Sequence, residues 1–206
     1  MSSVIPLLST SLGQKDEEAN IALAELIAKN KNAAAVSELI DTLKDKKLQN
    51  DCIKVLYEVG ERNTVLIEPH LPVFLELLNS KNNRLQWGGM MAIYCISKTN
   101  PEEVYASLGK IVAAADSGSV ITTDNAVNIL IQLAGNPTYA NDAFPLLLEQ
   151  LMKSPTNQLP MYAEKSMHLI NASNKNRFVE ILTFRLPEIE KDSKKKRVEK
   201  VLKKIG

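Results

Sequence analysis

Hydrophobic residues recur along the chain at positions i, i+3, i+4 and i+7, and most glycines and prolines fall between these periodic segments. This spacing places apolar side chains on one face of an α-helix. Strand-like alternation is nearly absent, with only residues 119–123 hinting at it. The pattern therefore predicts an all-α protein of about eleven helices. We place them at about 16–29, 33–43, 47–60, 64–78, 83–98, 101–115, 120–134, 139–153, 158–171, 174–190 and 193–205.

Four of these helices carry apolar residues that repeat every 37 positions. The first position of each set is always small, which lets neighbouring helices approach closely because side-chain bulk sets the distance between helix axes. Ser166 is the polar exception. The four columns are Cys52, Gly89, Ala126 and Ala163; Val55, Ala92, Ile129 and Ser166; Leu56, Ile93, Leu130 and Met167; and Val59, Ile96, Leu133 and Ile170.

The helices between these segments repeat less regularly. The apolar set that begins at Leu71 recurs 37 residues later at Leu108, then 36 residues later at Phe144, and Arg185 breaks the set in the next unit. We interpret the shorter interval as a change of one residue in a loop. Residues 19–43 form a shorter first unit.

A period of 37 residues with two helices per unit is typical of α-solenoids, in which each helix pair buries its apolar stripe against its neighbours. The pattern resembles HEAT repeats over residues 16–190, and the segments 45–60, 83–97 and 119–134 carry the resemblance. The ladder of Asp and Arg that HEAT units often stack is incomplete here, so armadillo-like repeats are the alternative within the same superfamily.

The resemblance implies a right-handed α-solenoid of stacked antiparallel helix pairs, a HEAT/ARM-like superhelix with about five repeats and a C-terminal capping helix. We expect one domain over residues 1–206. Its repeats are expected at about 16–45, 46–82, 83–118, 119–156 and 157–191, with the basic capping helix at 192–206.

Composition and charge agree with a folded, cytoplasmic protein. The chain has 206 residues, 45% of them hydrophobic, and a formal net charge of +1. Eight basic and two acidic residues give segment 191–206 a charge of +6, which leaves −5 for the rest. No apolar run approaches the 18 to 20 residues of a membrane span. The apolar residues near the N-terminus lack the basic start of a secretory signal, and two cysteines are no disulfide framework.

Candidate chemistry for an enzyme is missing from the sequence. Neither His70 nor His168 has cysteines at zinc-ligand spacing or partners of a hydrolase triad. The glycine pair Gly88-Gly89 lies inside a predicted helix, whereas phosphate-binding glycines lie between a strand and a helix. We therefore expect no metal, no cofactor, no evident small-molecule substrate and no enzymatic activity.

The residues that remain point to binding. Trp87 is a candidate interface anchor, because Trp is enriched in binding hot spots. If the second helices line a concave surface, their exposed positions are candidate protein contacts, represented by Glu76, Lys110 and Gln150. The basic C-terminal segment is expected to cap the last repeat with its apolar side. Alternatively, its cations bind nucleic acid, an anionic membrane surface or an acidic protein. These cations include Lys194, Lys195, Lys196, Arg197 and Lys200.

The leading hypothesis is a non-enzymatic scaffold or adaptor that binds a protein partner through a solenoid surface. The alternative is a nucleic-acid-binding protein, since some HEAT-like folds, the alkylpurine DNA glycosylases, act on DNA through a basic groove with Trp, Tyr and Asp. The body of this chain is acidic and has a single Trp, so that resemblance ends at the fold. A self-associating scaffold is a third possibility.

Overall fold

The computed structural model describes residues 3–206, which form helices connected by turns and contain no strand. The all-α prediction is therefore confirmed. The α-helices are α1 (Glu18–Asn30), α2 (Ala33–Thr42), α3 (Gln49–Arg62), α4 (Leu71–Leu77), α5 (Asn83–Ser97), α6 (Pro101–Ala106), α7 (Leu108–Ser117), α8 (Val120–Ala134), α9 (Ala140–Lys153), α10 (Leu159–Ser166), α11 (Lys175–Arg185) and α12 (Asp192–Ile205). Short 3-10 helices are η1 (Ile5–Leu7), η2 (Thr64–Leu66), η3 (Glu68–His70), η4 (Met167–Leu169) and η5 (Leu186–Glu188).

The chain divides into two compact units, Met1–Ile129 and Leu130–Gly206, and the division falls within α8. The expected single domain over residues 1–206 stays a prediction. None of the helices in the described part of the chain is long and apolar enough to cross a membrane.

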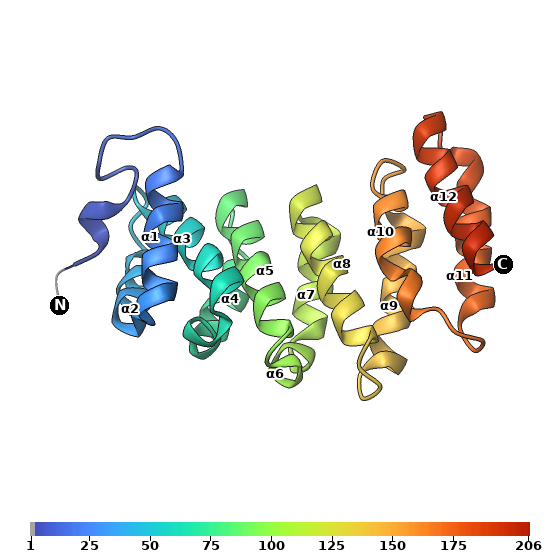
Figure 1. Cartoon of the computed structure of the whole chain (residues 1–206), viewed down its shortest axis with the longest axis horizontal. Coiled ribbons are helices and arrows are strands. Elements are labelled where there is room, and N and C mark those ends of the chain that lie inside the picture. Colours follow the sequence, from blue (N-terminus) through green and yellow to red (C-terminus); the bar gives the residue numbers. More distant parts are fainter. Residues whose placement is uncertain (1–2) are drawn as a thin grey trace. The chain divides into compact units, whose positions relative to one another are not determined.

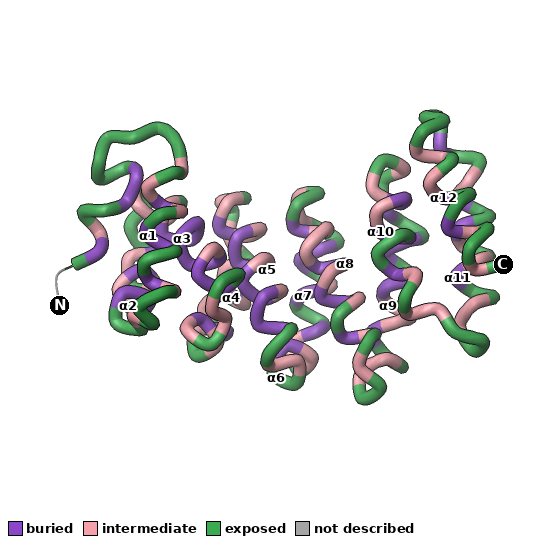
Figure 2. The backbone as a smooth tube through the Cα atoms, in the orientation of Figure 1, coloured by how far each residue is buried: buried purple, intermediate pink, exposed green. Residues whose placement is uncertain are grey.

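In the first unit, α3 lies between α1 and α5 and packs against both, while α2 packs against α3 and α4 against α5 (Figure 1). Figure 2 shows that α3 is buried along most of its length. The 37-residue columns contribute to the cores of both units. Every member of the four columns is buried except Met167 and Ile170, which are half-buried. The polar exception, Ser166, donates its hydroxyl hydrogen to the Tyr162 carbonyl oxygen at 2.7 Å, so its burial leaves no unpaired group.

The second helices are more broken than the sequence predicts. The expected helix 101–115 is two helices, α6 and α7, separated at Ser107. The expected helix 64–78 consists of η2, η3 and α4, because Pro69 and Pro72 each lack the N–H that would continue a helix. In the next repeat, Pro145 lies inside α9. It is 37 residues after Leu108, the first residue of α7. The chain breaks before Leu71 and again 37 residues later before Leu108, but α9 continues through Pro145 as one helix. Three helical segments per repeat, as in armadillo-type repeats, are therefore present only where this break occurs.

The glycines of α5 are packing residues. A Cβ atom on Gly89 would lie 3.0 Å from the Phe74 carbonyl oxygen and 3.1 Å from Leu77 Cβ, so α4 crosses α5 too closely for a larger residue. A Cβ atom on Gly88 would meet Ile53 Cγ1 of α3 at 2.6 Å. The pair therefore sets the spacing of α5 from both neighbours, as the small-residue column predicts for Gly89.

Residues before α1 pack onto the first helices. Leu8 is fully buried, and the backbone N–H of Val4 donates to Glu38 of α2 at 2.9 Å. The N–H of Ser9 donates to Asn20 of α1 at 3.0 Å, and that of Thr10 donates to Asp51 of α3 at 2.7 Å. These bonds hold the segment that leads to Glu17, the residue preceding α1.

In the second unit, the buried side chain of Arg185, the last residue of α11, contacts the C-terminal end of α9. Its guanidinium donates to the carbonyl oxygens of Leu151 (2.9 Å), Met152 (2.6 Å) and Ser154 (2.9 Å), and it pairs with Glu188 at 2.6 Å. The last carbonyls of a helix have no partners within that helix. Arg185 therefore breaks the apolar repeat because it satisfies the C-terminal end of the neighbouring helix.

Candidate partner-binding surfaces

A half-buried aromatic ring at the surface of the first unit packs against the buried ring of Tyr57 from the neighbouring helix. Trp87 of α5 is half-buried, and its ring centroid lies 5.5 Å from that of Tyr57 of α3, with the ring planes tilted by 49°. Positions 37 residues before and after Trp87 hold Asn50 and Asp124. Since the repeat does not require an aromatic side chain here, Trp87 is a feature of this surface rather than of the repeated core.

A cation lies over each of three aromatic rings on these helices. Lys54 Nζ is 5.0 Å from the centroid of Tyr57, and the Arg84 guanidinium carbon is 5.6 Å from that of Trp87. Lys98 Nζ is 4.2 Å from the centroid of Tyr94. The spacings of three or four residues put both partners on one side of a helix. Cations at such distances are attracted to the ring face.

An ion-pair network joins α3 to the residues on either side of it. Lys54 Nζ lies 2.6 Å from Glu58 Oε1 and 3.2 Å from Glu17 Oε2. Arg62 pairs with Glu58 at 2.5 Å and with Glu25 of α1 at 3.4 Å, and Arg84 pairs with Glu17. Arg62 and Glu25 are 37 residues apart, so this pair links equivalent positions of adjacent repeats.

Burial and hydrogen bonding set the protonation of this network. Burial alone would raise the pKa of Glu58, but hydrogen bonds from Lys54 and Arg62 outweigh it and lower this pKa. Burial alone would lower the pKa of Lys54, but its hydrogen bonds to Glu58 and Tyr57 raise it. Burial lowers the pKa of Arg84. The fixed charges of Lys54 and Glu58 at neutral pH therefore stabilise each other.

We define the α1–α3–α5 face as Glu17, Lys54, Tyr57, Arg84 and Trp87. Glu17, Arg84 and Trp87 are half-buried and reach its surface, while Lys54 and Tyr57 are buried. Its carboxylate, that of Glu17, pairs with the cations of Lys54 and Arg84.

The cysteines and the candidate metal ligands add no reactive centre to the described part of the chain. Burial raises the pKa of the Cys52 thiol to about 12 and that of Cys95 to about 11, so both stay protonated at neutral pH. Among residues 3–206, no group of three His, Cys, Asp or Glu side chains is arranged to hold a metal ion.

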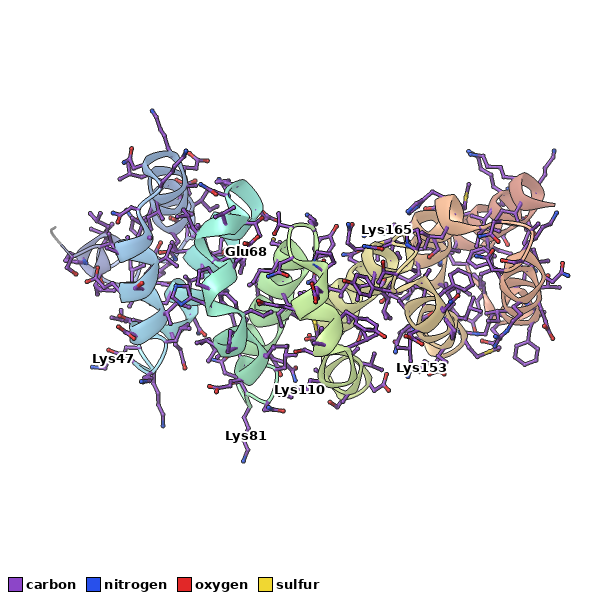
Figure 3. All side chains as sticks on the ribbon, turned by 90° about the horizontal axis from the view of Figure 1, so that it is seen from below. Lys47, Glu68, Lys81, Lys110, Lys153 and Lys165 are labelled. Carbon is purple, nitrogen blue, oxygen red and sulfur yellow. The ribbon has the colours of Figure 1, made fainter. Side chains whose placement is uncertain are left out.

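A groove of about 370 Å³ runs between α4, α6 and α7, and it brings together two of the predicted contact residues, Glu76 and Lys110. Figure 3 shows Lys110 on the same side of the ribbon as Lys81. The groove has an apolar part and a charged rim. Its other lining residues are Leu71, Pro72, Leu75, Asn79, Glu103, Ala106 and Ser107.

The other two predicted protein contacts do not line this groove. Trp87 belongs to the α1–α3–α5 face. The prediction that Gln150 is exposed was wrong, because only 3% of its surface is accessible. It lies in α9 beside the buried residues Leu147 and Leu151, on the side of the helix that faces the core of the second unit.

In the second unit, α12 packs against α10 and α11 and buries Val198 and Val201. Arg197 donates to both carboxylate oxygens of Glu164, at 2.8 and 2.5 Å, and Lys194 donates to the Asn157 carbonyl oxygen at 3.1 Å. Two of the five predicted anion-binding cations are thus used within this unit. The others are Lys195, which is half-buried, and Lys196 and Lys200, which are exposed.

Sequence reasoning identified Trp87 but not the groups around it. The spacing of three residues in Lys54–Tyr57 and in Arg84–Trp87 is visible in the sequence and indicates cation–aromatic pairs on a helix. Glu17 is 37 residues before Lys54 and 67 before Arg84. No local pattern reveals that its carboxylate meets both of them.

Comparisons with known proteins identify the fold. No protein-family model matches the chain. No curated protein sequence matches it either. Among solved structures, a designed armadillo repeat protein in complex with the peptide (KR)4 has a TM-score of 0.67 at 17% identity, over 99% of this chain and 100% of that one.

Two further designed proteins are similar. One is an engineered protein with a TM-score of 0.64 at 20% identity, over 100% of this chain and 97% of that one. The other is a computationally designed armadillo repeat protein for modular peptide recognition, with a TM-score of 0.65 at 18% identity, over 91% and 92% of the two chains. This chain therefore has an armadillo/HEAT-like helical-repeat fold.

Proposed function

We propose that this protein is a non-enzymatic scaffold that binds a peptide segment of a partner protein through the α1–α3–α5 face. The observation that carries the proposal is the half-buried Trp87, held against Tyr57 and covered by Arg84 on a surface where the repeat requires no aromatic residue. Large, rigid aromatic side chains and Arg dominate the energetics of protein interfaces.

The arrangement of the face suits an extended peptide. The α5 residues Arg84, Trp87, Met91 and Tyr94 are all half-buried and recur at intervals of three or four, so they form one stripe along the helix. Charged groups of α3 border this stripe. An extended peptide offers backbone donors and acceptors to the charged groups and side chains to the aromatic ones. Two structurally similar designed proteins, one in complex with (KR)4 and one made for modular peptide recognition, support this use of the fold.

The groove between α4, α6 and α7 is a second candidate contact surface within the same function. Glu76 and Lys110 at its rim carry opposite charges, and Leu71 and Leu75 provide apolar area. We rank it below the α1–α3–α5 face because its lining includes no aromatic residue. The α12 cations are ranked lowest, since Arg197 and Lys194 already have partners within the second unit.

A selection of random peptides on the purified chain tests the proposal. Peptides enriched by display are labelled, and their dissociation constants are measured by fluorescence anisotropy. We expect Trp87→Ala to weaken binding at least tenfold, because hot-spot aromatics typically contribute about 2 kcal/mol or more. Lys110→Ala is the control at the groove and should change affinity less than twofold. Peptides that bind the Trp87→Ala variant as tightly as the original chain would refute the proposed face.

A further inference from the structure

The carboxylate of Glu17 bridges two cations that come from different helices. Its Oε2 atom lies 3.2 Å from Lys54 Nζ of α3, and its Oε1 atom meets Arg84 Nη2 of α5. Arg84 lies over the ring of Trp87, and Lys54 lies over that of Tyr57. One carboxylate is therefore held above an aromatic pair by two positive groups.

Of the three charged side chains, that of Glu17 is the most exposed. The Lys54 side chain is 9% exposed and is fixed by Glu58, while the Glu17 side chain is 39% exposed. Residues 13–16, immediately before Glu17, are all exposed. The Arg84–Glu17 pair, whose side chains are 31% and 39% exposed, contributes little net stability because water competes for both charges. The cation pair is thus a preformed site, and Glu17 is a ligand that can be exchanged.

Arg84 also has unused hydrogen-bonding capacity. Its Nε atom is buried and has no hydrogen-bond partner. A guanidinium presents five N–H donors in a planar fork, which matches two carboxylate oxygens side by side. In the described part of the chain, Glu17 is the acid with which Arg84 forms a salt bridge. A ligand carboxylate that engages Nε as well as Nη2 would satisfy a donor that Glu17 leaves unpaired.

We propose that Lys54 and Arg84 form a recognition site for a carboxylate side chain of an acidic peptide, and that Glu17 occupies this site in the free chain as an internal competitor. The inference rests on the proposed function and adds the chemical class of the ligand. The ligand is a peptide segment with a Glu or Asp whose carboxylate replaces that of Glu17. The methylene groups next to that carboxylate lie against the indole of Trp87.

This assignment differs from that of the designed neighbour bound to (KR)4, a basic peptide. A basic ligand would need unpaired acids, but Glu17 on this face and Glu58, four residues after Lys54 in α3, are both paired with cations. Removing Glu17 would increase the attraction for an acidic ligand and decrease it for a basic one. The two ligand classes therefore predict opposite effects of the same substitution.

The experiment uses Trp87, the only tryptophan of the chain, as the reporter. The emission of the full chain is titrated with acetyl-hexaglutamate amide and, separately, with acetyl-hexalysine amide at low salt. The variants are Glu17→Gln, Arg84→Gln and the matched control Glu18→Gln. Glu18 is exposed and adjacent, so Glu18→Gln changes the net charge equally without touching the cation pair.

We expect hexaglutamate to change the Trp87 emission and Glu17→Gln to tighten its binding by about three- to fivefold, which corresponds to removal of up to about 1 kcal/mol of competing ion pairing. Glu18→Gln should change binding less than twofold, and Arg84→Gln should weaken it at least fivefold. Far-UV circular dichroism checks that all variants are folded.

Equal effects of Glu17→Gln and Glu18→Gln, or no response to hexaglutamate, would overturn the inference. A response to hexalysine alone would also overturn it while leaving the peptide-binding function intact. The proposed function itself fails only if display-selected peptides bind independently of Trp87, so the two failures are distinguishable.

Discussion

Replacing the buried Arg185 by leucine tests how the second unit is held together. The guanidinium is 6% exposed and supplies the hydrogen bonds for three carbonyl groups around the end of α9. Arg185→Leu keeps apolar bulk but removes every donor. The buried carbonyl group of Ser154 then loses its donor, and that of Leu151 keeps only the bond from the Ser154 hydroxyl at 3.2 Å.

The expected loss follows from the cost of unpaired buried groups. Each buried carbonyl left without a donor costs about 1–3 kcal/mol, and apolar packing of the leucine recovers part of this. We therefore expect Arg185→Leu to lower the free energy of unfolding by about 3 kcal/mol. Arg185→Lys should lower it by about 1–2 kcal/mol, because an ammonium keeps the charge near the helix C-terminus but cannot span all three carbonyls.

Urea unfolding followed by circular dichroism at 222 nm measures the effect. With a slope of about 2 kcal/mol per molar urea, a loss of 3 kcal/mol lowers the midpoint by about 1.5 M. The matched control is Arg177→Leu on the same helix, where the side chain is exposed and the change should stay within about 0.5 kcal/mol. If Arg185→Leu unfolds at the same urea concentration as Arg177→Leu, the capping role of Arg185 is wrong.

Further predictions concern packing, pH and reactivity. Gly89→Ala should destabilise the chain by about 1–3 kcal/mol, because the added Cβ would press on α4. Gly109→Ala in α7 has no atom within 4 Å of the added Cβ and should stabilise the chain by about 0.5–1 kcal/mol. Melting temperatures that shift in the same direction for both variants would contradict this. The pKa of Glu58 is lowered in the folded chain. Its contribution to the free energy of unfolding is therefore fully present above the unfolded pKa of about 4.3 and is lost as pH falls through the folded pKa. The destabilisation caused by Glu58→Gln should therefore be seen at pH 7 and disappear in acid, and a pH-independent difference would argue against the ion pairs. Cys52 and Cys95 should react with a thiol reagent only after unfolding, since both are buried with raised pKa values; rapid labelling of the native chain would show that the core opens.

The repeated core could be predicted from the sequence because one physical rule determines it. Helix faces that stack on equivalent neighbours need apolar residues at equivalent positions, so a recurring spacing of 37 identifies them, and a small residue such as Gly89 indicates close packing. The breaks at Ser107 and at Pro69 were missed because apolar periodicity continues across them, and the chain turns there without changing which residues face the core.

The site was only partly predictable, since its groups come from distant segments. Trp87 stands out as a single unusual side chain, and the cations of Lys54 and Arg84 lie at helical spacing from their rings. The position of Glu17 depends on how the segment before α1 folds over α1 and α3, which follows from backbone bonds such as that of Thr10 to Asp51. Gln150 was predicted to be exposed because its side chain is polar. Its burial is determined by the residues that pack around α9 and not by its residue type.

The most direct test of the proposed function is a map of backbone amide chemical shifts for the chain with and without a saturating display-selected peptide. We predict that the largest changes fall on α1, α3 and α5, around Glu17, Lys54 and Trp87. Changes concentrated on the basic residues of α12, or on the groove that contains Lys110, with none around Trp87, would contradict it.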